Sequence, residues 1–146
     1  MIESSDPAAV VRRLADATNA HDLEALVACF AEDYLNETPL HPARGFRGAE
    51  QVRRNWTQLF AGIPDLTARV LATAVDADTV WSEWEMAGRR RDGVAHRMRG
   101  VIIFRVVQGR AAAARFYLEP VDGANDSVDA EIARRTAASA PDRGRP

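Results

Sequence analysis

The most constraining feature of this chain is a series of four segments in its second half where apolar and polar residues alternate. These segments are residues 66–74, 79–87, 94–107 and 110–120. Short turn sequences separate them, at Asp76-Ala77-Asp78, Asp92-Gly93 and Gln108-Gly109. A period of two predicts β-strands, and connections this short predict that consecutive strands run antiparallel. The second half of the chain is therefore expected to form an antiparallel meander.

The first half of the chain has the spacing of helices instead. Asp6 followed by Pro7 begins a first helix, Asp22 caps a short second one, and a third is expected from about residue 49 to 60. An extended segment at 34–37 precedes the third helix, and residues 127–136 predict a last one. Helices followed by a meander predict an α+β fold, with three N-terminal helices packed on one side of a strongly curved antiparallel sheet. Residues 1–138 are expected to form one domain and residues 139–146 a flexible C-terminal tail.

The composition excludes several classes of protein. The net charge is −2 and there is no block of basic residues, so nucleic acid is not an expected partner. No stretch approaches the ~20 apolar residues of a membrane span. The 19 basic residues are all arginine, which excludes chemistry that needs a lysine. A single cysteine, Cys29, fits the reducing cytoplasm, and the three histidines lack ligand spacing, so neither a metal nor a cofactor is expected.

Two glutamates in the second strand segment are the main candidates for chemistry. Residues 80–86 interleave two tryptophans with two glutamates, and alternation places Trp81, Glu83 and Glu85 on one face of the strand. A two-residue turn at Asp92-Gly93 would set Glu85 opposite Gly100 and Glu83 opposite Ile102.

In this register the glutamates share their face with Met98 and Phe104. Carboxylates in such surroundings lose hydration, which raises their pKa toward the range useful for proton transfer.

A different loop length reverses this arrangement. One residue more or fewer in the hairpin loop would place Glu83 and Glu85 against Arg97 and Arg99, as a ladder of ion pairs on the surface. The sequence leaves both registers open.

Seven short strings, taken in their order, resemble one superfamily. They are Asn19-Ala20-His21-Asp22, Phe30-Ala31-Glu32-Asp33, Pro39-Leu40-His41-Pro42-Ala43-Arg44-Gly45, Ile63-Pro64-Asp65-Leu66, Gly100-Val101-Ile102-Ile103-Phe104, Gln108-Gly109-Arg110 and Arg115-Phe116-Tyr117. From about residue 10 to 121 the chain resembles the nuclear transport factor 2-like superfamily, in particular its SnoaL-like polyketide cyclases and limonene-1,2-epoxide hydrolase. The resemblance implies a sheet that forms a cone with an internal, mostly apolar pocket closed by the helices. Such a fold hosts cyclases, isomerases, hydrolases and binding proteins, so it does not specify one reaction.

The resemblance also implies positions for site residues. Glu85 falls where the epoxide hydrolase has an aspartate on its third strand. Glu37 falls near the hydrolase's asparagine on strand one, although Asn36 could take that place. Glu83 stands where the hydrolase has arginine and Phe116 where it has a second aspartate, so the Asp-Arg-Asp arrangement is absent.

These observations favour a cofactor-independent acid/base enzyme acting on a small apolar substrate. By resemblance it would be a polyketide or terpenoid cyclase, an isomerase or an epoxide-opening enzyme. Glu85 is the expected main proton-transfer group, and Glu37 or Glu83 its partner. The residues expected to bind the substrate are Asn36, His41, Trp56, Trp81, Met98 and Phe116. The alternative is a non-catalytic module of the same fold that binds a small ligand.

The outer face of the sheet predicts a homodimer. Arg115, Tyr117 and Glu119 alternate to the face turned away from the cavity, and Trp84 and Val101 are expected beside them. An exposed sheet face carrying Trp, Val and Tyr favours contact with a second copy of the chain.

Overall fold

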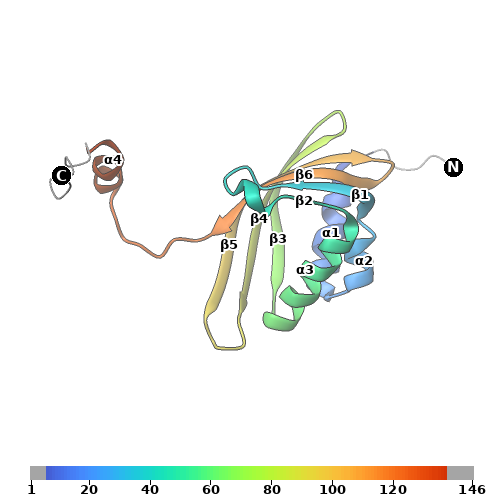
Figure 1. Cartoon of the computed structure of the whole chain (residues 1–146), viewed down its shortest axis with the longest axis horizontal. Coiled ribbons are helices and arrows are strands. Elements are labelled where there is room, and N and C mark those ends of the chain that lie inside the picture. Colours follow the sequence, from blue (N-terminus) through green and yellow to red (C-terminus); the bar gives the residue numbers. More distant parts are fainter. Residues whose placement is uncertain (1–5, 138–146) are drawn as a thin grey trace, which may run out of the picture.

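The fold is of the α+β type, with four α-helices and one six-stranded mixed sheet among residues 6–137, which are the residues described by this computed structural model (Figure 1). The elements in chain order are α1 (Ala8–Ala20), α2 (Leu23–Val27), β1 (Phe30–Glu37), the 3-10 helix η1 (Pro42–Arg44), β2 (Phe46–Arg47), α3 (Ala49–Gly62), β3 (Thr67–Asp76), β4 (Thr79–Arg89), β5 (Ala95–Val107), β6 (Arg110–Pro120) and α4 (Val128–Thr136).

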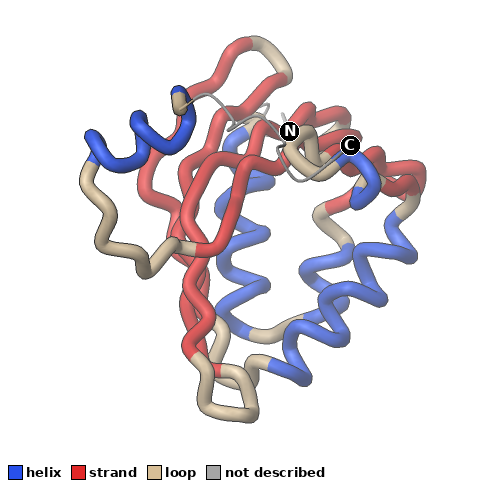
Figure 2. The backbone as a smooth tube through the Cα atoms, turned by 60° about the vertical axis from the view of Figure 1, so that its left-hand side comes forward, coloured by secondary structure: helices blue, strands red, loops and turns tan. Residues whose placement is uncertain are grey.

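The strand order is β2-β1-β6-β5-β4-β3, and β3 to β6 form the predicted meander. The expectation of a purely antiparallel sheet is wrong, because β1 pairs with β6 in the parallel direction. These two strands are far apart in the chain, so no short turn forces them to be antiparallel. Helices α1, α2 and α3 lie together on one side of the sheet (Figure 2).

Local signals place the first two helices as predicted. The Asp6 carboxylate accepts a hydrogen bond from the Ala8 N–H at 3.0 Å at the start of α1. Helix α1 ends at His21, whose backbone is left-handed, with φ 52°. The next residue, Asp22, caps α2 by accepting a hydrogen bond from the Ala25 N–H at 3.1 Å. The His21 ring also lies 2.8 Å from the Leu66 carbonyl oxygen, which ties the turn between α1 and α2 to the start of β3.

The hairpin between β4 and β5 does not have the predicted two-residue turn. The Arg90 N–H donates to the Val94 carbonyl at 2.9 Å, and the Gly93 N–H donates to the Arg90 carbonyl at 2.9 Å. The loop therefore contains three residues, 91–93, and Gly93 occupies its left-handed position with φ 87°. The strands consequently pair Glu85 with Arg99 and Trp84 with Gly100. The prediction of Glu85 opposite Gly100 is wrong by one residue.

Because the register differs by one residue from the predicted one, the Trp84 side chain lies in the core. Trp84 is fully buried beneath the helices. Its indole N–H donates to the Ser82 hydroxyl at 2.8 Å, and that hydroxyl donates to the Ile102 carbonyl at 2.6 Å. A buried indole with a satisfied N–H is a stable arrangement. The prediction that Trp84 contributes to an outer dimer surface is therefore wrong.

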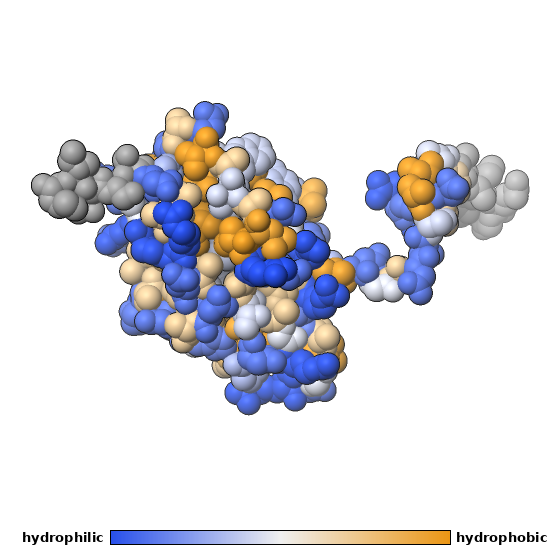
Figure 3. All heavy atoms as spheres, turned by 180° about the vertical axis from the view of Figure 1, so that it is seen from behind, coloured by the Kyte–Doolittle hydropathy of each residue, from blue (hydrophilic) through white to orange (hydrophobic). Residues whose placement is uncertain are grey.

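Helix α4 lies apart from the rest of the fold, beyond residues 121–127, which form no helix or strand (Figure 1). Ser127 caps it by accepting a hydrogen bond from the Ala130 N–H. Its apolar side chains Val128 and Ile132 are exposed, and apolar atoms are visible on it in Figure 3. The predicted tail, 139–146, lies outside the described residues. Within residues 6–137 no helix has the length and apolar character needed to cross a membrane.

Candidate active site

A cavity of about 430 Å³ lies between helix α3 and the inner face of the sheet. Eleven apolar side chains contribute to its wall: Phe30, Phe46, Val52, Trp56, Leu59, Leu66, Met86, Met98, Phe116, Leu118 and Pro120. The volume lies within the range of roughly 300–1,000 Å³ typical of small-molecule sites. A wall of this kind suits a small, largely apolar molecule.

One line of polar groups enters this wall from strand β1. Tyr34 is fully buried, and its hydroxyl donates to Asn36 Oδ1 at 2.7 Å. Burial raises the pKa of the Tyr34 phenol, so the group stays protonated and remains a donor. The Asn36 Nδ2 has only a long contact of 3.5 Å with the Thr38 hydroxyl. Because Tyr34 occupies the amide oxygen, Asn36 has donor capacity left for an oxygen atom of a ligand.

Three titratable side chains lie at the border of the cavity: Glu119 on β6, His96 on β5, and His41 in the loop after β1. The Glu119 carboxylate lies 2.9 Å, Oε1 to Nε2, from the His41 ring, and both side chains are 35% exposed. Among the described residues Glu119 is the only carboxylate in the cavity wall. His96 also lines the cavity, is half-buried, and has no side-chain hydrogen bond within residues 6–137. The border of the cavity therefore carries the Glu119 carboxylate, which is hydrogen-bonded to His41, and the His96 imidazole, which has no hydrogen-bond partner among the described residues.

The three-residue loop places both strand glutamates on the outer face of the sheet. Glu85 pairs with Arg69 at 3.2 Å and with Arg99 at 3.6 Å, and Glu83 is exposed opposite Val101. These carboxylates keep their access to water and cations, so the desolvation on which their acid/base roles depended does not occur. Of the two registers that the sequence left open, the structure has the second for Glu85, in which this carboxylate forms ion pairs on the surface of the sheet.

Side chains alternate between the two faces of a strand, and this alternation decides which of the other predicted site residues on the strands face the cavity. Glu37 is exposed and lies opposite Arg115 of β6 in the sheet, while Asn36 lines the cavity. Trp81 is 47% exposed on the outer face and does not line the cavity.

The structure brings four of the predicted substrate-binding residues together in the cavity wall: Asn36, Trp56, Met98 and Phe116. His41 reaches this wall through Glu119 rather than directly. Contact of these residues with a substrate remains a prediction.

Sequence reasoning missed Tyr34, His96 and Glu119 as members of the site. Alternation along β1 pairs Tyr34 with Asn36 on one face, which is a signal that could have found it. His96 lies opposite Gly88, and with a three-residue loop its side chain falls on the inner face of the sheet. By alternation along β6, Glu119 falls on the outer face of the sheet together with Arg115, as predicted. Because Glu119 lies near the end of the strand, its carboxylate can still form a hydrogen bond with His41.

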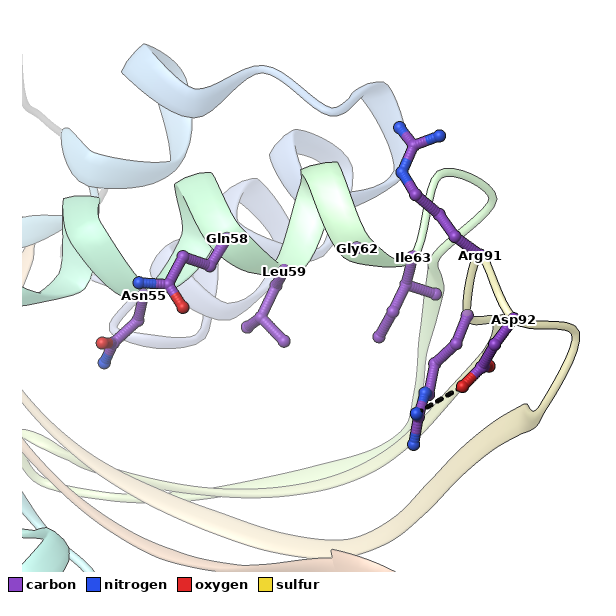
Figure 4. A pocket seen from close by; sticks show the side chains of 8 residues that line it. Asn55, Gln58, Leu59, Gly62, Ile63, Arg91 and Asp92 are labelled. Atoms are coloured by element: carbon purple, nitrogen blue, oxygen red, sulfur yellow. Dashed lines mark hydrogen bonds and ion pairs between the residues drawn. The ribbon is translucent and has the colours of Figure 1, made fainter.

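A second, more open hollow of about 720 Å³ adjoins the cavity (Figure 4). It lies between α3 and the β4–β5 hairpin and shares Asn55 and Leu59 with the cavity wall. Among residues 6–137 no group of three or more His, Cys, Asp or Glu side chains could hold a metal ion.

An α+β fold with helices over a mixed sheet is shared with many solved proteins. The sequence pattern of the SnoaL-like domain matches residues 11–137. The chain belongs to this SnoaL-like family, which confirms the resemblance drawn from its short strings. A comparison with curated proteins gave no significant match.

Three solved proteins illustrate the shared fold. IdmH, a putative polyketide cyclase from Streptomyces antibioticus, is 23% identical with a TM-score of 0.67, covering 77% of this chain and 91% of IdmH. An LEH-like epoxide hydrolase of Mycobacterium tuberculosis is 16% identical with a TM-score of 0.68, covering 81% of this chain and 86% of the hydrolase. RV0760c from Mycobacterium tuberculosis, solved with estradiol-17beta-hemisuccinate, is 22% identical with a TM-score of 0.66, covering 85% and 96%. At these identities the likeness is one of fold.

Proposed function

We propose that this protein is a cofactor-independent acid/base enzyme that acts on a small, largely apolar molecule in the cavity. In this proposal the curved sheet and helices α1 to α3 form a cone, and its interior is the binding pocket. The observation that carries the proposal is the Glu119–His41 pair at the border of a mostly apolar wall. A carboxylate held by an imidazole beside an apolar site is an arrangement suited to proton transfer.

Glu119 is the proton-transfer group in this proposal, because it is the only acidic residue among the described residues that line the cavity, and His41 holds its carboxylate. Its Oε1 is held by His41, so Oε2 remains available to a substrate. His41 acts as a positioning residue through that hydrogen bond. Glu119 would remove a proton from a carbon next to a carbonyl group and return it at another position, so no proton is gained or lost overall.

Asn36 would stabilise the charge that forms in this step. Removing the proton moves negative charge onto the carbonyl oxygen, and the Asn36 Nδ2–H groups can donate to an oxygen in the cavity. Tyr34 keeps the amide in that orientation by donating to its oxygen. Cyclisation and isomerisation of a polyketide-like or terpenoid molecule both need only these groups. Epoxide opening by two carboxylates has less support, because Glu119 is the one carboxylate in the described cavity wall.

The neighbours support the class of ligand. IdmH is described as a putative polyketide cyclase, and RV0760c holds a steroid ester, both on this fold. A second candidate function, binding without chemistry, is favoured by one observation: the inner sheet face presents tryptophan and methionine where the strand glutamates were expected. Both candidates use the same cavity.

Hydrogen exchange in an apolar ketone separates these two functions. With 2-tetralone in D2O, the enzyme should speed the loss of the α-proton NMR signal. Glu119→Gln should slow this exchange by roughly a hundredfold while binding of 2-tetralone is kept, since glutamine preserves the shape but not the base. Glu83→Gln is the matched control and should change nothing. Binding of 2-tetralone by the wild type without any exchange would support the binding module instead.

We also propose that the chain forms a homodimer through the outer sheet face. Trp81 is 47% exposed there, and Val101 and Tyr117 pair beside it on β5 and β6. Trp81 thus takes the place first assigned to Trp84. Light scattering at micromolar concentration should give about twice the chain mass of 16.0 kDa, and Trp81→Glu should return the value to one chain.

A further inference from the structure

The open hollow beside the cavity is lined by Arg90 and Arg91, which belong to the only run of three arginines in the chain, residues 89–91. It adjoins the cavity, since Asn55 and Leu59 on α3 line both spaces. In Figure 4 the Asn55, Leu59 and Ile63 side chains project to the same side of α3, toward the strands of the sheet, whereas the Arg91 side chain points the other way. A molecule in the cavity could therefore extend one end into this hollow.

The hairpin is held in place against the end of α3. The Arg91 N–H donates to the Gly62 carbonyl at 3.2 Å, and Arg91 Nε donates to the Ala61 carbonyl at 2.6 Å. On the other side of the loop, the Arg89 N–H donates to the Asp65 carboxylate at 2.7 Å. These bonds fix the loop before any ligand arrives, which lowers the entropy lost on binding.

The charges around the hollow are not balanced. Arg89 and Arg91 direct their side-chain hydrogen bonds to backbone carbonyls, and neither forms an ion pair within the described residues. Arg90 pairs with Asp92, the contact drawn as a dashed line in Figure 4. Asp65 is the other carboxylate in contact with the loop. Of the described residues that line the hollow, Arg90 and Arg91 carry positive charge and Asp92 is the one carboxylate, and a site with excess positive charge attracts anions.

We propose that this hollow binds the carboxylate end of a ligand whose apolar body occupies the cavity, with Arg90 as the residue that contacts the carboxylate. A guanidinium group can donate two parallel hydrogen bonds to a carboxylate. Arg90 is half-exposed and already paired, so the ligand competes with Asp92 for it. The Asn55 amide has N–H groups left, since Gln51 donates to its oxygen at 2.8 Å, and it provides a second donor between the two spaces. This assignment rests on the proposed function of the cavity as the ligand site.

Two probes of equal length separate the hollow from the cavity. Decanoate and 1-decanol share the apolar chain and differ in the carboxylate, and each can displace an environment-sensitive fluorescent dye from the cavity. The wild type should bind decanoate about fivefold more tightly than 1-decanol, the size expected of one solvent-exposed charge pair. Added salt should reduce this preference, because it screens exposed charges.

The variants test the named residues. Arg90→Gln should remove the preference for decanoate and leave 1-decanol binding unchanged. Asp92→Asn should increase the preference, since it removes the competing charge and keeps the oxygen that accepts from the Val94 N–H. Arg97→Gln makes the same charge change on the outer face and should have no effect.

The possible outcomes distinguish the two proposals. Equal binding of both probes by the wild type, or a preference that survives Arg90→Gln, would overturn the carboxylate site and leave the cavity intact as a ligand site. Failure of both probes to bind would overturn the cavity as well.

Discussion

The two faces of strand β4 have opposite surroundings, although their residues alternate along a single segment. On the inner face, Ser82, Trp84 and Met86 are buried against the helices and the cavity. On the outer face, Trp81 is exposed and Glu85 pairs with arginines. The length of the β4–β5 loop, three residues rather than two, decides which of these two sets of side chains faces the helices. The composition of a strand therefore indicates that it has two faces, but the register decides which face performs the chemistry.

The largest expected difference between the faces is in stability. Trp84→Ala should lower the free energy of unfolding by about 3–5 kcal/mol, because it opens a cavity in the core and leaves Ser82 without its donor. Trp81→Ala on the outer face should cost less than about 1 kcal/mol for the isolated chain. Urea denaturation of both variants, at a concentration where light scattering shows the same assembly state, measures the difference. Equal losses would mean that the two rows are wrongly assigned.

The next effect tests the cross-strand pairing that fixes the register. Gly100 pairs with Trp84 on one side and Leu118 on the other, at φ 150°. A Cβ atom there would lie 2.0 Å from the Tyr117 carbonyl oxygen. Gly100→Ala should therefore destabilise the fold by about 2 kcal/mol or more, since backbone must move.

Gly93→Ala is the comparison for Gly100→Ala. Gly93 is left-handed as well, but a Cβ atom there would meet nothing within 4 Å. Its expected cost is about 1 kcal/mol, from the conformation alone. Thermal unfolding of both variants would contradict the observed register if Gly93→Ala were the more damaging.

Much of the fold follows from local sequence. The Asp22 cap, the Gln108-Gly109 turn and the four alternating segments predicted elements that the structure contains. The parallel pairing of β1 with β6 was not predictable in this way, because it joins segments about 80 residues apart in the chain and no turn chemistry specifies it. Helix order and strand period are local properties, whereas strand partners are not.

The site was predicted less well than the fold for one physical reason. Asp92-Gly93 is compatible with both a two-residue turn and a three-residue loop with glycine in the left-handed position, so the dipeptide alone does not choose between them. Choosing the first moved Glu83, Glu85 and Trp81 together to the wrong face. Asn36, Trp56, Met98 and Phe116 did not depend in the same way on one tight turn, and the structure places all four in the cavity wall.

A smaller effect concerns Tyr34, the inward-facing phenol on β1. Its pKa is raised in the folded protein by burial, so the folded state holds this proton more tightly than the unfolded state. The stabilisation from the neutral phenol is therefore complete below about pH 10, the unfolded value, and is lost as pH rises above it. In this range the wild type should lose about 1.4 kcal/mol more per pH unit than Tyr34→Phe.

The same substitution has a fixed cost at neutral pH. Tyr34→Phe removes the donor to Asn36, which should cost about 1 kcal/mol. Denaturant titrations at several pH values from 7 to 11 measure both quantities. Parallel curves for the two proteins above pH 10 would show that the phenol is not buried as described.

The smallest effect is expected on the outer face, at the residues first proposed as catalytic. Glu85→Gln weakens contacts with Arg69 and Arg99, which are 71% and 48% exposed, so it should change the free energy of unfolding by less than about 1 kcal/mol. Glu83→Gln has no ion pair to lose among the described residues and should be closer to zero. Neither variant should alter the exchange of 2-tetralone protons, because both carboxylates lie on the face turned away from the cavity. The decisive measurement is that exchange rate in Glu85→Gln beside Glu119→Gln. A loss confined to Glu85→Gln would mean that the inner and outer rows of β4 are reversed in solution.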